Sequence, residues 1–325
     1  MPTLTTRVLR RIAAVSPSRL VSLSIASALI GMLVVAGCAR LEEKERELTF
    51  RVVHDNASWY DGLPAGVESV DVAVGSAGGQ HIHGWWWPAA QSGAPAVLYL
   101  HGARWNLTGH LYRIEQLRDF GFSVFAIEYR GFGESDAELP SERTVYEDAR
   151  AAWTWLAARE PDARKRYIYG HSLGGAVAVD LAASASEGAA PPAAGLIVES
   201  TFTTLADIAH ELTYPWLPIQ LVLTQKFDSA RKIAHVNVPV LIVHGAGDRY
   251  VPSRFAKALY DAAPGPKKLL LVEGASHNNS MWIGNAAYKA ALHDLFGLGG
   301  AASAARPRSP KTPPRVASPA RASHG

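Results

Sequence analysis

Short apolar runs recur along the middle of the chain, separated by longer segments in which apolar residues return every three or four positions. The runs lie at residues 96–100, 123–128, 166–169, 239–243 and 268–272. Runs of this kind are typical of strands buried on both faces of a parallel sheet. Segments such as 111–120 and 141–159 have helical periodicity. The alternation therefore predicts an α/β domain with a mostly parallel sheet and helices on both faces.

An antiparallel hairpin is predicted ahead of these units. Valine alternates with other residues at 70–74, a second strand follows at 81–87, and the glycine-containing stretch 75–79 is the turn. His81 and His83 share one face of the second strand, but two histidines alone make a poor metal site. We expect no metal ion there, and we expect the three consecutive tryptophans of this strand to serve packing.

The sequence GHSLGG at residues 170–175 follows a strand pattern and precedes a small-residue helix pattern at 176–183. This is G-x-S-x-G in the strand–turn–helix context of a nucleophile elbow. The turn is tight, so the positions two before and two after Ser172 must lack bulk, and Gly170 and Gly174 meet that need. The alternative is a glycine-rich turn whose serine only caps the helix.

A nucleophilic serine needs a base, and the base needs an acid that orients it. Asp248 follows the apolar run 239–243, and His277 follows the next run at 268–272. The loops after neighbouring parallel strands lie side by side, so the order Ser, Asp, His predicts a triad at one edge of the sheet. Glu199, after the preceding strand, is the alternative acid.

These residues carry a resemblance to the α/β-hydrolase serine hydrolases, of the Bem46 and monoacylglycerol-lipase-like groups. The matching motifs are LHG at 100–102, EYRGFGES at 128–135, GHSLGG at 170–175, ESTF at 199–202, HGAGDRYVP at 244–252 and GASHNN at 274–279. The resemblance implies an eight-stranded sheet and an oxyanion hole formed by the N–H groups of Ala103 and Leu173. Glu128 stands where relatives usually have Asp, at a position that is generally structural.

Residues 201–237 lie where cap domains insert in this fold, and the short length predicts a small cap with helices at 205–212 and 219–226. Apolar side chains in and near this segment are candidates for an acyl pocket. They are Trp105, Tyr214, Trp216 and Leu221. The alternative is that they simply pack a short helical excursion.

The amino end resembles a bacterial export signal. Basic residues precede an apolar stretch at 20–35, which ends in Val-Ala-Gly before Cys38, the only cysteine. This resembles a lipobox, which implies lipidation of Cys38 and a membrane-anchored lipoprotein of the cell envelope; a plain signal anchor is the alternative. The predicted organisation is a signal peptide at 1–37, a tether or short helix at 38–50, the hydrolase domain at 51–300 and a disordered basic tail at 301–325.

Positive charge is concentrated at the two ends. The formal net charge is +3, but the first 38 residues hold four arginines and the last 25 hold four arginines and one lysine, with no acid in either. The middle of the chain therefore carries about −6. An acidic domain argues against nucleic-acid binding, so the expected partners are a small acyl ester and, through Cys38, a membrane. We expect a monomer.

The pattern predicts a serine hydrolase that needs no cofactor. Ser172 would attack an acyl carbonyl with His277 as general base and Asp248 as its orienting acid, and Ala103 and Leu173 would bind the oxyanion. Within enzymes, a thioesterase, a peptidase and a cofactor-free haloperoxidase are alternatives. The competing class is a non-catalytic envelope protein that uses the fold to bind ligands.

Overall fold

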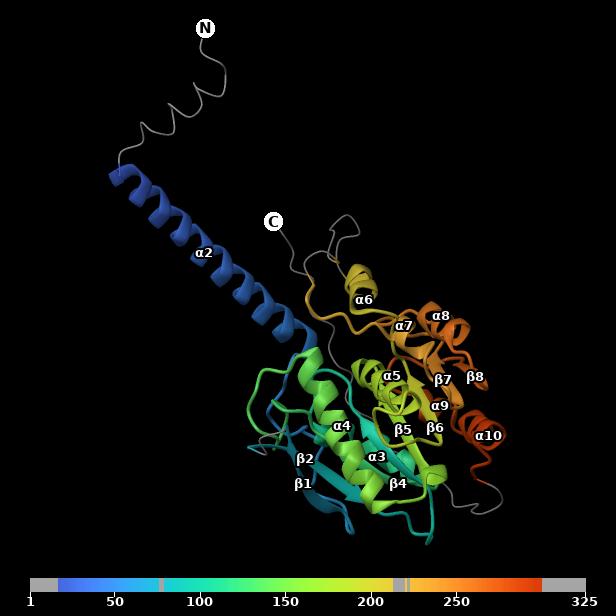
Figure 1. Ribbon diagram of the computed structural model, residues 1–325. Helices are drawn as coiled ribbons and strands as arrows, with labels where there is room; N and C mark the ends of the chain where they lie inside the picture. The colour runs from blue at the N-terminus through green and yellow to red at the C-terminus, as the bar shows by residue number, and fades with distance from the viewer. Residues whose placement is uncertain (1–16, 76–78, 213–219, 221–222, 300–325) are drawn as a thin grey trace.

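The computed structural model describes residues 17–75, 79–212, 220 and 223–299. Within these ranges eight strands form one sheet in the order β1-β2-β4-β3-β5-β6-β7-β8 (Figure 1). The strands are β1 (Glu68–Val74), β2 (Gln80–Trp87), β3 (Ala96–Leu100), β4 (Ser123–Ile127), β5 (Arg166–His171), β6 (Gly195–Glu199), β7 (Val240–Gly245) and β8 (Lys267–Val272). The first two pairings in this order are antiparallel and the remaining five are parallel. The predicted mostly parallel, eight-stranded sheet is confirmed.

The inner strands form because their side chains are apolar on both faces. Every residue of β3, β4 and β6 is buried, whereas β8 at the edge of the sheet is only partly buried. The parallel register sets Leu100 of β3 opposite Gly170 of β5, and Gly170 opposite Val198 of β6. The carboxyl ends of these strands therefore meet at one edge of the sheet, which is where the predicted site residues follow.

Helices cover both faces of the sheet (Figure 1). One face is covered by α4 (Glu142–Arg159), α5 (Leu173–Ser186) and α8 (Arg254–Ala262), and the other by α3 (Leu107–Asp119), α9 (Ser280–Ile283) and α10 (Asn285–Phe296). α4 begins with a capping box between Ser141 and Thr144, at the boundary that the periodicity predicts. α3 begins at Leu107, four residues earlier than predicted, because Asn106 caps its first turn.

The helix α2 (Pro17–Phe50) passes through Cys38 without a break. It projects from the domain and meets it near α4 (Figure 1). Of the helices in the described ranges, none has the length and apolar character needed to cross a membrane. The segment predicted as a tether or short helix is thus the last part of a long helix, and Phe50 at its end is fully buried against Phe227.

The first predicted cap helix is present as α6 (Leu205–Leu212). The second predicted cap helix, at 219–226, lies partly outside the described residues. Its last four residues, 223–226, are described and are not helical, so that part of the prediction is wrong. A short helix that the sequence did not predict, α7 (Ser229–Ile233), follows instead. We call residues 223–228 the cap root.

The cap root has no regular secondary structure, and its backbone donors bind side chains from elsewhere. The N–H groups of Thr224 and Gln225 donate to Glu45 of α2, at 2.8–2.9 Å. The N–H groups of Lys226 and Phe227 donate to Glu142 of α4, at 2.6 and 2.9 Å. Two carboxylates thus bind four successive N–H groups, at the end of the predicted helix, that would otherwise donate to carbonyl groups four residues earlier in a helix.

Candidate active site

The serine of the GHSLGG motif makes the sharp turn between β5 and α5. β5 ends at His171 and α5 begins at Leu173, so Ser172 is the only residue between them. Its φ of 55° and ψ of −121° form a conformation that residues with a side chain rarely adopt. The N–H of Ser172 donates to the carbonyl oxygen of Glu199 (2.9 Å), and the Thr201 hydroxyl donates to the carbonyl oxygen of Ser172 (2.8 Å). These bonds hold the strained turn at the carboxyl edge of the sheet.

The glycines around the serine are needed for close packing. A Cβ on Gly170 would lie 2.1 Å from the carbonyl oxygen of Gly174, and a Cβ on Gly174 would lie 2.1 Å from that of Leu100. A Cβ on Gly175 would lie 2.5 Å from the Cβ of Thr201. No side chain fits at these distances, so the lack of bulk expected around the serine has a direct steric cause.

The structure brings Ser172, His277 and Asp248 together in one hydrogen-bonded chain. The Nε2 atom of His277 lies 3.0 Å from the hydroxyl oxygen of Ser172. Its Nδ1 atom lies 2.7 Å from Oδ2 of Asp248. A carboxylate only accepts, so Nδ1 carries the proton and the Nε2 lone pair faces the serine. This is the arrangement in which an imidazole takes a proton from a hydroxyl.

Asp248 is held as a buried anion. Its side chain has no exposed surface, and its Oδ1 accepts from the N–H groups of Tyr250 (2.8 Å) and Val251 (2.9 Å). His244, at the end of β7, places its Nε2 3.3 Å from Oδ2 of Asp248. Burial alone would raise the pKa of Asp248, but the hydrogen bonds from His244 and His277 outweigh burial and hold this pKa well below its ordinary value. The carboxylate is therefore charged wherever the protein is folded near neutral pH.

The loop that carries His277 is fixed by two buried side chains. The Nε2–H of His171 donates to the carbonyl oxygen of His277 at 2.9 Å. Arg113 of α3 donates to the carbonyl oxygen of Asn278 at 3.1 Å. Burial, followed by the charge of Arg113, lowers the pKa of His171 well below its ordinary value, so its ring is neutral. The sequence analysis did not predict a role for His171 or Arg113 at this site. The position of His171 directly before Ser172 could have indicated one, whereas nothing in the sequence around Arg113 does.

Glu199 does not serve the histidine. Its side chain is fully buried and accepts from the guanidinium of Arg113 (2.6 Å) and from the hydroxyl of Tyr169 (2.8 Å). The hydroxyl of Tyr288 lies 3.4 Å from the same carboxylate. The alternative prediction, that Glu199 is the acid that orients His277, is therefore wrong. The acid that is hydrogen-bonded to His277 is Asp248.

The predicted oxyanion donors lie on either side of the serine. Gly102 packs so closely that a Cβ on it would be 3.2 Å from the Cβ of Ser172, and Ala103 follows it on the same turn. Leu173 is the first residue of α5, where helix N–H groups have no intrahelical acceptor. In the described part of the chain, neither the N–H of Ala103 nor that of Leu173 donates to another residue. Both N–H groups are thus available to bind an oxyanion.

The histidine before this turn is structural. His101 donates from Nδ1 to the carbonyl oxygen of Gly102 at 2.6 Å, and its ring stacks on His110. Burial lowers the pKa of His101 to about 4, so the ring is neutral at physiological pH. Glu128 is structural as well. It accepts from the N–H groups of Leu107 (3.0 Å) and Glu134 (2.6 Å), so it joins the start of α3 to the loop after β4.

The candidate substrate residues are only partly described. Trp105 lies next to the oxyanion turn, with its ring 5.5 Å from that of Trp59. Tyr214, Trp216 and Leu221 lie outside the described residues. Tyr250, which is 52 % exposed, sets its ring 5.7 Å from that of His277 and was not predicted at the site.

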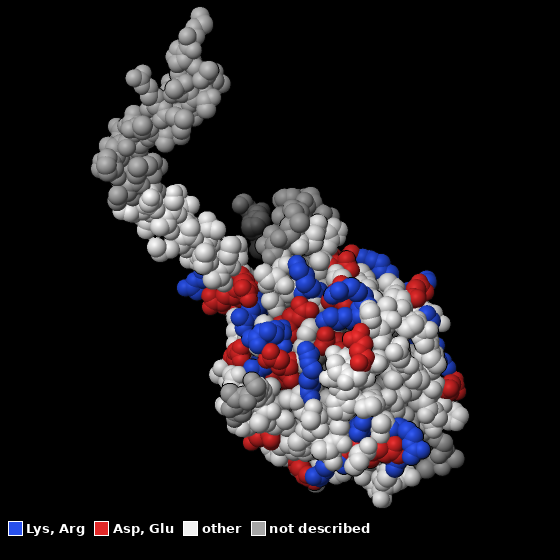
Figure 2. Space-filling view, viewed as in Figure 1, with Lys and Arg blue, Asp and Glu red and all other residues white. Residues whose placement is uncertain are grey.

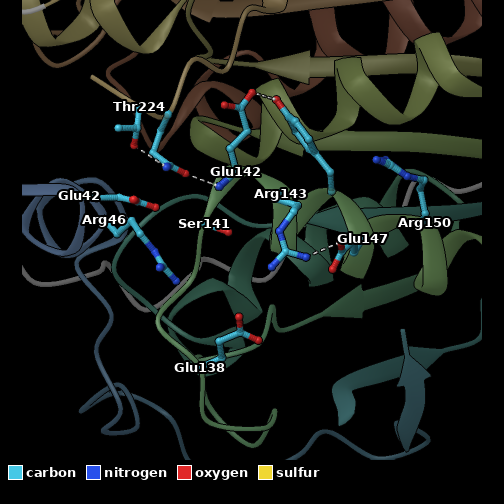
Figure 3. A pocket seen from close by; sticks show the side chains of 11 residues that line it. Glu42, Arg46, Glu138, Ser141, Glu142, Arg143, Glu147, Arg150 and Thr224 are labelled. Atoms are coloured by element: carbon cyan, nitrogen blue, oxygen red, sulfur yellow. Dashed lines mark hydrogen bonds and ion pairs between the residues drawn. The ribbon is translucent and has the colours of Figure 1, made fainter. Parts of the chain in front are cut away.

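A hollow of about 500 Å³ lies elsewhere, between α2, α4 and the cap root (Figure 3). Glu42 and Arg46 line it from α2, and Glu142 lines it from α4. It contains none of the three hydrogen-bonded residues, so we assign the candidate site from the geometry around Ser172 and not from this hollow. His83 bonds Asp71 (3.0 Å), and across the described ranges no group of three or more His, Cys, Asp or Glu side chains is placed to hold a metal ion.

Known proteins are similar to this chain in sequence and in fold. A family described as serine aminopeptidase, S33, matches residues 92–228. The uncharacterized protein Rv2307c of Mycobacterium tuberculosis is 37% identical over 219 residues, which cover 67% of this chain and 74% of that protein. The chain belongs to the α/β-hydrolase family. The Pyrococcus furiosus esterase Pf2001 has the same fold, with a TM-score of 0.60 at 18% identity over 76% of this chain and 98% of its own.

One of the relatives that are similar in sequence is named for its activity. Lysophosphatidylserine lipase ABHD12 of Danio rerio is 34% identical over 201 residues, which cover 57% of this chain and 51% of the lipase. The predicted resemblance to α/β-hydrolases is therefore confirmed at the level of family and fold.

Proposed function

We propose that this α/β-hydrolase cleaves carboxylic esters through an acyl-enzyme on Ser172. The observation that carries the proposal is the chain of hydrogen bonds from Ser172 through His277 to Asp248, with distances of 3.0 and 2.7 Å. A hydroxyl that faces the Nε2 atom of an imidazole, whose Nδ1 atom is bonded to a buried carboxylate, is equipped for nucleophilic attack on a carbonyl.

The reaction follows from this geometry. His277 takes the proton of Ser172 as the serine oxygen attacks the acyl carbon, and Asp248 stabilises the imidazolium. The N–H groups of Ala103 and Leu173 bind the oxyanion of the tetrahedral intermediate. His277 then protonates the leaving alcohol, and the acyl group stays on the serine. Water, activated by the same imidazole, releases the acid and restores the enzyme.

Similarity favours esters over amides as substrates. The lipase named above acts on a lysophospholipid by its name, and the structural neighbour is named an esterase. The family match carries the name of an aminopeptidase, which keeps peptide bonds as the second candidate. Nothing in the triad itself separates ester, thioester and amide substrates, because all three pass through a tetrahedral oxyanion.

A substrate series on the purified full chain tests the bond type. We expect p-nitrophenyl esters of two to twelve carbons to be hydrolysed, with a clear optimum in kcat/KM along the series, and we expect aminoacyl p-nitroanilides to turn over at least about 100-fold more slowly. The optimum would report the size of the acyl pocket. Faster cleavage of the anilides than of every ester would assign the protein to the peptidases instead.

We further propose that Cys38 is lipidated and anchors the domain to a membrane of the cell envelope. Cys38 is exposed on α2, and the acidic middle of the chain begins only after it. We expect the wild type to incorporate an alkyne fatty acid in cells and Cys38→Ser to lose this label. Equal labelling of the wild type and the variant would contradict lipidation at this residue.

We propose no nucleic-acid partner. Basic and acidic side chains are intermingled on the face of the domain where α2 joins it (Figure 2), which does not favour binding to a nucleic acid.

A further inference from the structure

The last residue of α2 and the chain just after it bind the backbone of the oxyanion turn. The N–H of Arg104 donates to the carbonyl oxygen of Phe50 at 2.8 Å. The N–H of Val53 donates to the carbonyl oxygen of Arg104, also at 2.8 Å. Both backbone polar groups of Arg104 are therefore bound by residues from the amino end of the chain. The neighbouring residue, Ala103, carries one of the two proposed oxyanion donors.

Arg104 needs this support. Its φ is 84°, in the region where residues with a side chain are strained, and its own side chain is exposed. A strained residue keeps its conformation only when its surroundings hold it. Here the holding groups are main-chain atoms of Phe50 and Val53, and Phe50 is itself anchored because its ring is fully buried against Phe227.

The end of α2 is docked on the domain by side chains as well. Glu45 accepts from the N–H and hydroxyl of Thr224 and from the N–H of Gln225, at 2.7–2.9 Å. Arg46 donates to the carbonyl oxygens of Leu139 and Pro140. Arg46 and Thr224 both line the hollow between α2, α4 and the cap root (Figure 3). The helix is thus bound to the domain about one turn before its last residue, Phe50, and Val53 follows three residues later.

We infer that Glu45, Phe50 and Val53, which we call the N-terminal clamp, position the oxyanion turn of the active site. The inference rests on the proposed function, because it concerns the Ala103 donor of that reaction. An oxyanion donor acts in the transition state and must be held at about 2.7–3.1 Å from the developing charge. The clamp binds the two peptide groups that follow this donor, Ala103–Arg104 and Arg104–Trp105, and so limits how far the Ala103 N–H can turn. Glu45 keeps the clamp in place. All three residues are positioning residues, since among the described residues no hydrogen bond joins any of them to Ser172 or His277.

The test removes the clamp bonds one at a time in the full chain. Val53→Pro deletes the N–H that binds Arg104, and Asp55→Pro is its control, because the N–H of Asp55 donates to no residue in the described ranges. Glu45→Ala removes the contact with the cap root without a backbone change. Glu47→Ala is its control, since Glu47 lies on the same helix and pairs with Lys44 at the surface.

We expect Val53→Pro to lower kcat for p-nitrophenyl acetate about tenfold, less than the ~10²-fold or greater loss of a whole donor, with KM within about twofold. Glu45→Ala is expected to lower kcat in the same way, about threefold or more. In both variants the amide of Arg104 should exchange with deuterium about tenfold faster, because its bond to Phe50 opens more often. Both control variants should match the wild type in kcat and exchange.

The outcomes separate the two proposals. A wild type without any turnover refutes the proposed function, and the role of the clamp in that reaction is refuted with it. An active wild type together with a folded Val53→Pro that exchanges faster at Arg104 yet keeps full kcat overturns the clamp alone. If Val53→Pro does not fold, Glu45→Ala decides: unchanged kcat and unchanged exchange at Arg104 overturn the inference.

Discussion

Replacing Ser172 with alanine is expected to lower kcat/KM for p-nitrophenyl esters by at least about 10⁴-fold. The hydroxyl of Ser172 lies 3.0 Å from the Nε2 atom of His277, the position from which the imidazole can take its proton. Without it no acyl-enzyme forms, and the remaining oxyanion donors give only a small residual rate. The fold should persist, because the backbone N–H and C=O of residue 172 keep their bonds to the Glu199 carbonyl oxygen and the Thr201 hydroxyl when the side chain is alanine. Initial rates and a thermal melt of both proteins measure these two expectations.

Ser200→Ala is the matched control. Ser200 also has a positive φ, of 52°, follows the neighbouring strand β6, and is fully buried. Its hydroxyl has no hydrogen-bond partner among the described residues. Its removal should therefore leave kcat/KM within about twofold and should not lower the free energy of unfolding. Equal turnover by Ser172→Ala and the wild type would remove Ser172 from the mechanism.

Asp248→Asn is expected to lower kcat about 10³–10⁴-fold, while Glu199→Gln keeps most of the activity. An amide at position 248 offers His277 a donor as readily as an acceptor, so the imidazole loses the tautomer that presents a lone pair to Ser172. It also removes the negative charge that stabilises the imidazolium. The wild-type carboxylate keeps its charge at every pH used for assay, because hydrogen bonds from His244 and His277 hold its pKa well below the ordinary value against the effect of burial.

Glu199→Gln should act on stability. Glu199 and Arg113 form a fully buried ion pair at 2.6 Å, and a neutral partner leaves the guanidinium without its counter-ion. Breaking such a pair costs about 3–5 kcal/mol of unfolding free energy. Urea unfolding and steady-state kinetics on both variants separate the two roles. If Glu199→Gln lost more activity than Asp248→Asn while remaining folded, the acid would have to be reassigned to Glu199.

Much of the fold was predictable because the signals are local. Each inner strand is a contiguous apolar run, and the polar residues of the site come directly after such runs. Ser172, Asp248 and His277 could therefore be placed at one edge of the sheet before their contacts were known. The turn around Ser172 was predictable for a similar reason, since the need for Gly170 and Gly174 follows from the tight backbone alone.

The rest depends on contacts between distant parts of the chain. Arg113 and Glu199 are 86 residues apart, and no local pattern pairs them, so Glu199 was plausible as an acid until its partner was seen. The second cap helix was wrong because Glu45, 179 residues before Thr224, binds the N–H groups at its expected end. Helical propensity cannot anticipate such a competitor, and the same holds for the contact between Val53 and Arg104.

Covalent labelling of the full chain with a fluorophosphonate probe tests the central claim most directly. The probe reacts only with a serine that is activated by its base and whose oxyanion is bound, so it reports Ser172, His277 and the two N–H donors together. The account predicts one labelled peptide, with the modification on Ser172, and no labelling in Ser172→Ala. Labelling on another serine, or none on a folded wild type, would contradict it.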